Sequence, residues 1–242
     1  MYHAVEASSR PPRYKHFYVT AQAFAWQMRA LKRAGYTALS FAQLAAALDG
    51  VSPLPRRPVL LTFDDGYANL VPHVHPLLRA LGFPYTVFLV SGKVGGSNDW
   101  VAADGYEPTP LLGWDDISKM QSEGGVDFQA HTVTHPHLTR LPIGDARQEM
   151  QACKDALEQR LQAPVTTLCY PYGDVNDTVR DAAGEAGYQM AVTTQTGRVR
   201  QGDDRLRLPR LSVYHVPPVS LTYGVGALNF WWRVRSWKDT RP

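Results

Sequence analysis

Residues 58–66 read Pro-Val-Leu-Leu-Thr-Phe-Asp-Asp-Gly, and this stretch decides the fold. A short apolar run with β-branched and aromatic side chains predicts a buried strand, and the glycine after it predicts a turn. Two carboxylates, Asp64 and Asp65, stand where the strand ends. A second stretch repeats the arrangement, because the short run 126–130 is followed by His-Thr-Val-Thr-His at 131–135. Polar side chains at strand ends are typical of parallel α/β folds, in which ligands bind at the carboxyl ends of the strands.

These acidic and imidazole side chains suit a metal site. One carboxylate and two imidazoles form a three-ligand set for a catalytic divalent metal that keeps one position open for water. The spare carboxylate is the base that such a water needs. The plain alternatives are that Asp64 and Asp65 are exposed loop acids and that His131 and His135 belong to a surface loop. Because both motifs follow strands in one chain, the pattern favours the metal site.

The composition is that of an ordinary globular protein. The chain has 242 residues, of which 44% are hydrophobic and 19% charged, and its net charge is +3. No block of Lys and Arg stands out, so the sequence gives little support to nucleic-acid binding. The two cysteines, Cys153 and Cys169, are too few for a disulfide framework and form no CxxC pair. We therefore expect both to be buried as small apolar residues.

The sequence shows no signal peptide and no apolar stretch of transmembrane length, which predicts a cytoplasmic protein. Residues 1–5, however, read like the end of a strand whose beginning is missing. If the chain is truncated there, a periplasmic or extracellular location is expected instead.

Short apolar runs alternate with amphipathic helices along the chain. The pattern predicts, among other elements, a helix over 143–161 and strands over 85–90 and 166–170. Strands that alternate with helices imply parallel βαβ units in one α/β domain, either a barrel or an open doubly wound sheet. We predict a single domain over 1–242, in which residues 219–242 could form a C-terminal helical tail.

The motifs resemble those of a known family. Thr-Phe-Asp-Asp-Gly at 62–66 and His-Thr-Val-Thr-His at 131–135 look like the first two motifs of the polysaccharide deacetylases, carbohydrate esterases that share a chitooligosaccharide deacetylase homology domain. Tyr-Pro-Tyr-Gly at 170–173 resembles the third motif. The likeness covers nearly the whole chain. Tyr2-His3 and the Trp-Asp-Asp-Ile that begins at Trp114 resemble the branch that acts on poly-N-acetylglucosamine and related exopolysaccharides.

The resemblance implies a distorted, incomplete (β/α) barrel of the TIM type with about seven strands. It also implies one divalent metal, most often zinc and sometimes cobalt or nickel, held by Asp65, His131 and His135. Asp64 would be the general base, and the backbone N–H of Tyr172 would stabilise the oxyanion together with the metal.

Two departures from the family pattern affect the rest of the site. An arginine that holds the base often opens the third motif, whereas 168–170 reads Leu-Cys-Tyr here. The fifth motif usually supplies a Leu-x-His acid, whereas 208–215 reads Leu-Pro-Arg-Leu-Ser-Val-Tyr-His, so that His215 is either the acid or an unrelated surface residue. The side chains expected to bind substrate or to support the ligands are His3, Thr132, Tyr170, Pro171, Trp114, Arg210 and His215.

Two of these expectations have plain alternatives. His3 follows the first predicted strand and could face the same mouth as the metal, or it could be a frayed N-terminal residue. Trp114, with Trp100 and Tyr106 of the long loop before it, could stack on sugar rings or form the core of the loop.

We expect a metal-dependent hydrolase that removes N-acetyl groups from an amino-sugar-containing polysaccharide or oligosaccharide, with the acetylated glycan as its partner. Two alternatives stay open. One is a deacylase of a lipid-linked sugar or small amide, and the other is a glycan-binding protein with a weakened active site, which the incomplete fifth motif suggests.

Overall fold

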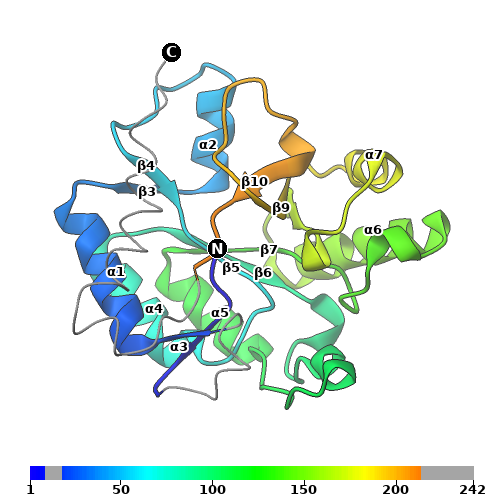
Figure 1. Cartoon of the computed structure of the whole chain (residues 1–242), viewed down its shortest axis with the longest axis horizontal. Coiled ribbons are helices and arrows are strands. Elements are labelled where there is room, and N and C mark those ends of the chain that lie inside the picture. Colours follow the sequence, from blue (N-terminus) through cyan, green and yellow to red (C-terminus); the bar gives the residue numbers. More distant parts are fainter. Residues whose placement is uncertain (9–17, 214–242) are drawn as a thin grey trace.

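The computed structural model describes residues 1–8 and 18–213. Its centre is a six-stranded parallel sheet in the order β10-β9-β8-β7-β6-β5, which curls so that helices surround it (Figure 1). The strands are β5 (Thr62–Phe63), β6 (Tyr85–Leu89), β7 (Val126–Ala130), β8 (Thr167–Cys169), β9 (Met190–Thr196) and β10 (Leu208–Arg210). Strands that pair in sequence order with helices between them form the expected βαβ units.

The first residues of the chain bond to both edges of this sheet. The backbone N–H of Tyr2 donates to the carbonyl of Thr62 at 2.8 Å, and the N–H of Asp64 donates to the carbonyl of Tyr2 at 3.0 Å. On the other side, the N–H of Val213 donates to the carbonyl of Met1 at 3.0 Å. Met1 and Tyr2 therefore lie between β5 and the residues that follow β10. The result is a curled, incomplete barrel, which confirms the predicted fold class.

Helices cover the outside of the sheet (Figure 1). They are α1 (Ala21–Arg33), α3 (Leu70–His73), α4 (His75–Leu81), α5 (Trp114–Glu123), α6 (Ile143–Leu161) and α7 (Asp177–Glu185). Two further parallel pairs flank the barrel: β1 (Ala4–Glu6) with β2 (Tyr18–Thr20), and β3 (Thr37–Leu39) with β4 (Pro58–Leu60), between which α2 (Phe41–Leu48) is inserted. The strand expected within 58–66 is thus two strands, because β4 pairs with β3 and only β5 joins the main sheet.

The sheet buries apolar side chains on both faces. Successive side chains of a strand point to opposite faces, and Phe63, Val87 and Leu168 belong to the large core under the helices. The opposite face carries a smaller core made of Phe88, Cys169, Met190, Val192 and Leu208, which Phe41 and Leu44 of α2 close. Strand alternation therefore directs every second side chain toward the inside of the barrel.

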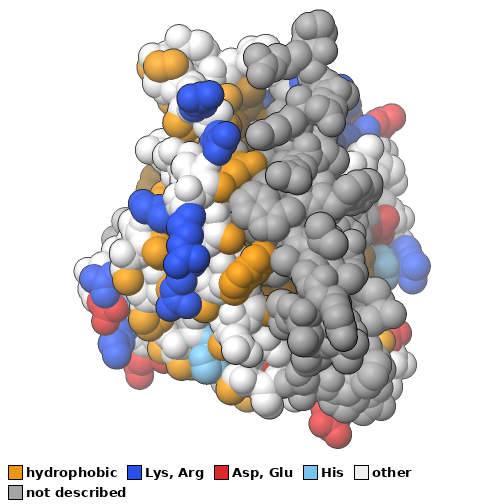
Figure 2. All heavy atoms as spheres, turned by 60° about the vertical axis from the view of Figure 1, so that its left-hand side comes forward, with side chains coloured by type: hydrophobic (Ala, Val, Ile, Leu, Met, Phe, Trp, Pro, Cys, Tyr) orange, Lys and Arg blue, Asp and Glu red, His pale blue; other side chains and the backbone are white. Residues whose placement is uncertain are grey.

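Lys and Arg side chains gather on the face that carries α1, whose last turn contains Lys32 and Arg33, and they are mixed there with apolar and neutral groups (Figure 2). Among the described residues, no helix combines the length and the apolar character needed to cross a bilayer.

Candidate metal centre and catalytic base

Asp65, His131 and His135 meet beyond the carboxyl ends of β5 and β7. The Oδ1 atom of Asp65 lies 3.3 Å from Nε2 of His131 and 3.4 Å from Nε2 of His135. All three residues are buried, and Asp65 Oδ1 has no hydrogen-bond partner. Buried acceptors are normally satisfied, so an oxygen left open between two ring nitrogens fits a cation. One carboxylate and two imidazoles are also a donor set that zinc accepts.

A hydrogen bond on the far side of the His131 ring fixes which nitrogen faces this cluster. Its Nδ1 atom lies 2.6 Å from the carbonyl oxygen of Cys169. A carbonyl can only accept, so Nδ1 carries a proton, and in the neutral ring Nε2 keeps its lone pair. Metal-binding histidines in proteins are commonly oriented in this way.

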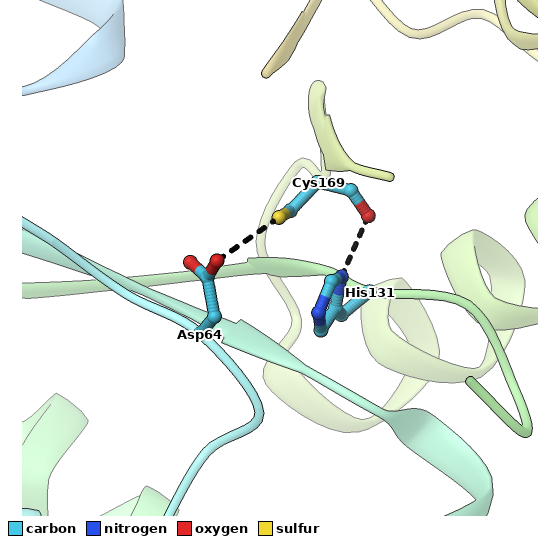
Figure 3. A group of neighbouring side chains, drawn as sticks. All are labelled: Asp64, His131 and Cys169. Atoms are coloured by element: carbon cyan, nitrogen blue, oxygen red, sulfur yellow. Dashed lines mark hydrogen bonds between the residues drawn. The ribbon is translucent and has the colours of Figure 1, made fainter. Parts of the chain in front are cut away.

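A second group of possible ligands, Asp64, His131 and Cys169, shares His131 with the first. Figure 3 shows the Cys169 thiol directed at Asp64 and the Cys169 carbonyl directed at the His131 ring. Burial raises the pKa of the Cys169 thiol, which disfavours the thiolate that would bind a metal. Both carboxylate oxygens of Asp64 are also occupied by another partner. The first group is the better metal site.

That partner is Arg210, whose guanidinium holds Asp64 from the inside of the barrel. Its Nη1 donates to Oδ1 of Asp64 at 2.7 Å, and its Nη2 donates to Oδ2 at 2.7 Å. Further bonds from Arg210 reach Thr62 Oγ1 at 3.2 Å and Cys169 Sγ at 3.1 Å. The arginine that the third motif lacks is therefore supplied by β10, and Cys169 packs beside it.

Burial and charge act in opposite directions on the two aspartates. Burial by itself would raise the pKa of Asp64, but the charge and hydrogen bonds of Arg210 outweigh it and lower the pKa to about 2. Burial would likewise raise the pKa of Asp65, whereas His131 and His135 hold it well below its usual range. Burial lowers the pKa of His135, which favours the neutral imidazole that a metal needs.

His3 lies next to Asp64. Its Nε2 is 4.0 Å from Oδ2 of Asp64, and its side chain is 20% exposed whereas that of Asp64 is 4% exposed. The backbone bonds of Tyr2 to Thr62 and Asp64 account for this position. His215 and residues 219–242 lie outside the described part of the chain.

The other expected site residues lie at different distances from the cluster. Thr132 is buried, and its Oγ1 accepts from the backbone N–H of His135 at 3.1 Å. Tyr170 and Pro171, which precede Tyr172 in the chain, are buried, and the Tyr170 hydroxyl donates to the carbonyl of Leu206 at 3.0 Å. Trp114 begins α5 in the helix layer, where Arg160 lies 5.3 Å from its ring centroid.

The motifs share an uncommon backbone conformation. Asp65, Thr132, His135 and Tyr172 have φ values of 70°, 66°, 64° and 60°, and among the described residues only one other non-glycine has a positive φ. Such conformations cost free energy and concentrate at functional sites. The following Gly173 cannot be replaced, because a Cβ there would lie 2.2 Å from Oγ1 of Thr194.

One aromatic residue contacts the cluster although it was not among the site residues expected from the sequence. Trp100, in the 3-10 turn η3 (Asp99–Asp104), stacks on His135 with ring centroids 4.4 Å apart. Tyr172 meets the same imidazole edge-on at 4.7 Å, and its side chain is 44% exposed. The sequence shows only that an aromatic residue lies in a long loop, and such a residue fits the core of the loop equally well.

The family model for polysaccharide deacetylases matches residues 52–191, more than half of the chain. The chain belongs to the polysaccharide deacetylase family. The resemblance seen in the sequence and the prediction of a hydrolase acting on carbon–nitrogen bonds are thereby confirmed.

Individual relatives of this deacetylase support the same family assignment. A poly-beta-1,6-N-acetyl-D-glucosamine N-deacetylase of Staphylococcus epidermidis is 26% identical over 210 residues, which are 82% of this chain and 69% of the relative. The Streptococcus pyogenes deacetylase PplD, solved in complex with acetate, superposes with a TM-score of 0.74 at 26% identity, covering 90% of both chains. A polysaccharide deacetylase from Bacillus cereus gives a TM-score of 0.74 at 26% identity, covering 93% of this chain and 67% of that one.

Proposed function

We propose that this deacetylase is metal-dependent and removes N-acetyl groups from a polymer of N-acetylglucosamine, of which the β-1,6-linked form is the first to test. The observation that carries the proposal is the buried Oδ1 of Asp65, which lies between two histidine nitrogens and has no hydrogen-bond partner. The neighbouring carboxylate, that of Asp64, is bound by Arg210 instead. The name of the Staphylococcus epidermidis relative supports the substrate class.

Asp65, His131 and His135 would hold the ion, and zinc fits their donors. When bound, a divalent ion supplies Lewis acidity that activates a water and polarises an amide carbonyl. Asp64 is ionised at neutral pH, because its pKa is about 2, and it accepts the proton of the attacking water at a carboxylate oxygen. The backbone N–H of Tyr172 would bind the oxygen on which negative charge develops.

The leaving amine needs a proton, and His3 is in position to supply it. A carboxyl group with a pKa of about 2 holds a proton only briefly. An imidazole is the usual proton carrier near neutral pH. His3 lies 4.0 Å from the Asp64 carboxylate and is partly exposed, so it can reach both the base and a bound glycan.

The first test is metal content. We expect one divalent ion per chain in protein purified without chelator, and a large loss of zinc in His131→Ala. Elemental analysis of both proteins measures it, and equal zinc content would refute the ligand assignment. Zinc affinity should also fall as the pH drops, because protons compete for the imidazoles. Burial by itself would lower the pKa of His131, but Cys169 and Asp65 hold it well above its ordinary value, so its share of this loss should begin at a higher pH than for a free histidine. Burial lowers the pKa of His135, so its share of this loss should come at a lower pH than for a free histidine.

The second test concerns the proton donor. His3→Ala should lower kcat on an N-acetyl substrate by more than about tenfold, since general acid–base groups contribute about 10²- to 10⁴-fold. The zinc content should stay unchanged, because His3 is not in the ligand set. A variant at His215 provides the comparison. If His215→Ala costs a hundredfold and His3→Ala costs nothing, then His215 is the acid.

The two alternatives are less well supported. An intact set of Asp64, Asp65, His131 and His135 argues against a glycan-binding protein with a decayed site. Acetate release from β-1,6-linked N-acetylglucosamine oligomers, compared with release from N-acetylglucosamine monomer and from a simple acetamide, distinguishes a polysaccharide deacetylase from an enzyme for small amides.

A further inference from the structure

The loop that carries both histidines is bonded to its surroundings on one side through its carbonyl groups. The backbone N–H of Ser91 donates to the carbonyl of Thr132 at 3.0 Å, and the N–H of Gly92 donates to the carbonyl of Val133 at 3.0 Å. The approach is close, because a Cβ on Gly92 would lie 2.7 Å from the oxygen of Val133. These bonds leave the N–H groups of the loop to another partner.

That partner is the carboxylate of Glu149, which extends from the second turn of α6. Its Oε2 accepts from the backbone N–H of Val133 at 2.8 Å and from that of Thr134 at 2.9 Å. Its Oε1 accepts from the hydroxyl of Thr134 at 2.7 Å. All three bonds go to the two residues that lie between Thr132 and His135. Hydrogen bonds to an ionised carboxylate are shorter and stronger than those between neutral groups.

The conformation of the loop explains why it needs such an anchor. Thr132 and His135 both have left-handed φ values, 66° and 64°, on either side of the pair that Glu149 binds. Non-glycine residues persist in that region only when the surrounding structure holds them there. The N–H groups of Val133 and Thr134 converge on one oxygen, so removing that oxygen would leave them without their acceptor.

We propose that Glu149 is a positioning residue for the metal centre. Its carboxylate fixes the backbone of Val133 and Thr134, and thereby sets the separation and direction of the His131 and His135 rings. It touches neither the reacting atoms nor the ligand atoms. This inference rests on the proposed metal dependence. It adds that tight binding of the metal requires Glu149.

Zinc binding measures the effect directly. We expect Glu149→Ala to bind ZnCl2 about 10- to 100-fold more weakly than the unsubstituted chain, as is typical when groups behind metal ligands are removed. The zinc affinity of Glu149→Gln should stay within about fivefold of that of the unsubstituted chain. Its amide oxygen can accept from both N–H groups and its NH2 can donate to Thr134 Oγ1, so that only the contribution of the negative charge to these hydrogen bonds is lost. Titration calorimetry gives the affinities, and the absorption spectrum of the CoCl2-loaded proteins reports the ligand geometry.

Asp155→Ala is the matched control. It removes a carboxylate from the same helix, at an exposed position whose hydrogen bond goes to Gln151 on that helix at 2.8 Å. Its zinc affinity should equal that of the unsubstituted chain. Circular dichroism and the metal-free Tm establish that each variant is folded.

The outcomes separate this inference from the proposed function. If the unsubstituted chain binds no divalent metal, the proposed function fails. If it binds zinc and folded Glu149→Ala binds zinc with the same affinity and cobalt spectrum, then Glu149 is not a positioning residue. Should Glu149→Ala fail to fold, Glu149→Asp takes its place, because a carboxylate one methylene shorter cannot keep all three bonds to Val133 and Thr134. Weaker zinc binding in Glu149→Asp than in Asp155→Ala would support the proposal, and equal binding in the two would overturn it.

Discussion

Replacing Asp64 by asparagine is expected to lower kcat by about 10²- to 10⁴-fold, the usual contribution of a general base. Asparagine has the same shape but cannot take up a proton. Metal content should be unchanged, because Asp64 faces Arg210 whereas Asp65 faces the two histidines. Acetate release from an N-acetylglucosamine oligomer gives the rate, and elemental analysis gives the zinc content.

The neighbouring carboxylate provides the control for this experiment. Asp65→Asn should lose zinc as well as activity, because it removes the charged oxygen between His131 and His135. Near-native turnover in Asp64→Asn, with bound zinc, would show that Asp64 is not the base. Loss of zinc from both variants would show that the two carboxylates do not divide the roles in this way.

Replacing Arg210 by methionine is expected to destabilise the protein by about 3–5 kcal/mol, because it leaves a buried carboxylate without its partner. Asp64 and Arg210 are both buried and joined by two hydrogen bonds of 2.7 Å. Chemical denaturation measures the loss. Activity should fall too, since the base loses the groups that orient it.

The pH dependence of this loss has a definite sign. In the unsubstituted chain the pKa of Asp64 is lowered from its ordinary value of 3.8 to about 2, so its contribution to stability is present above pH 3.8 and is lost as the pH falls toward 2. In Arg210→Met, only the charges of His3 and His131 still oppose burial, so the pKa of Asp64 should rise above its ordinary value. The variant should therefore recover part of its stability as the pH falls and Asp64 takes up a proton.

Two further variants test the cause. Arg207→Met removes an arginine three residues away whose ion pair with Asp177 is exposed, and it should cost about 1 kcal/mol or less. Adding Asp64→Asn to Arg210→Met should restore part of the lost stability, because the unpaired charge disappears. If Arg210→Met is no less stable than Arg207→Met at neutral pH, the buried pair does not stabilise this fold.

Local sequence patterns were enough to predict the class of fold and the chemistry of the main cluster. Apolar runs that end in Asp-Asp-Gly and in His-x-x-x-His can be read locally, because strand alternation and turn glycines act over a few residues. The same holds for the helix predicted over 143–161, which α6 matches, and for the strand over 85–90, which β6 matches within one residue. Parallel strands then place both motifs at one end of the barrel.

Which distant residues contact that cluster depends on how the strands, loops and helices pack in three dimensions. Arg210 reaches Asp64 across 146 positions of sequence, because β5 and β10 stand at opposite edges of a sheet that curls until their inner faces meet. The stacking of Trp100 on His135 depends on the path of a long loop, and the bonds of Glu149 depend on how α6 lies against the histidine loop. Local patterns carry no information about curl, register or helix docking. Arg210 was expected at the site from the sequence, but its partner Asp64, like the contacts of Trp100 and Glu149, could therefore be found only once the chain was seen folded.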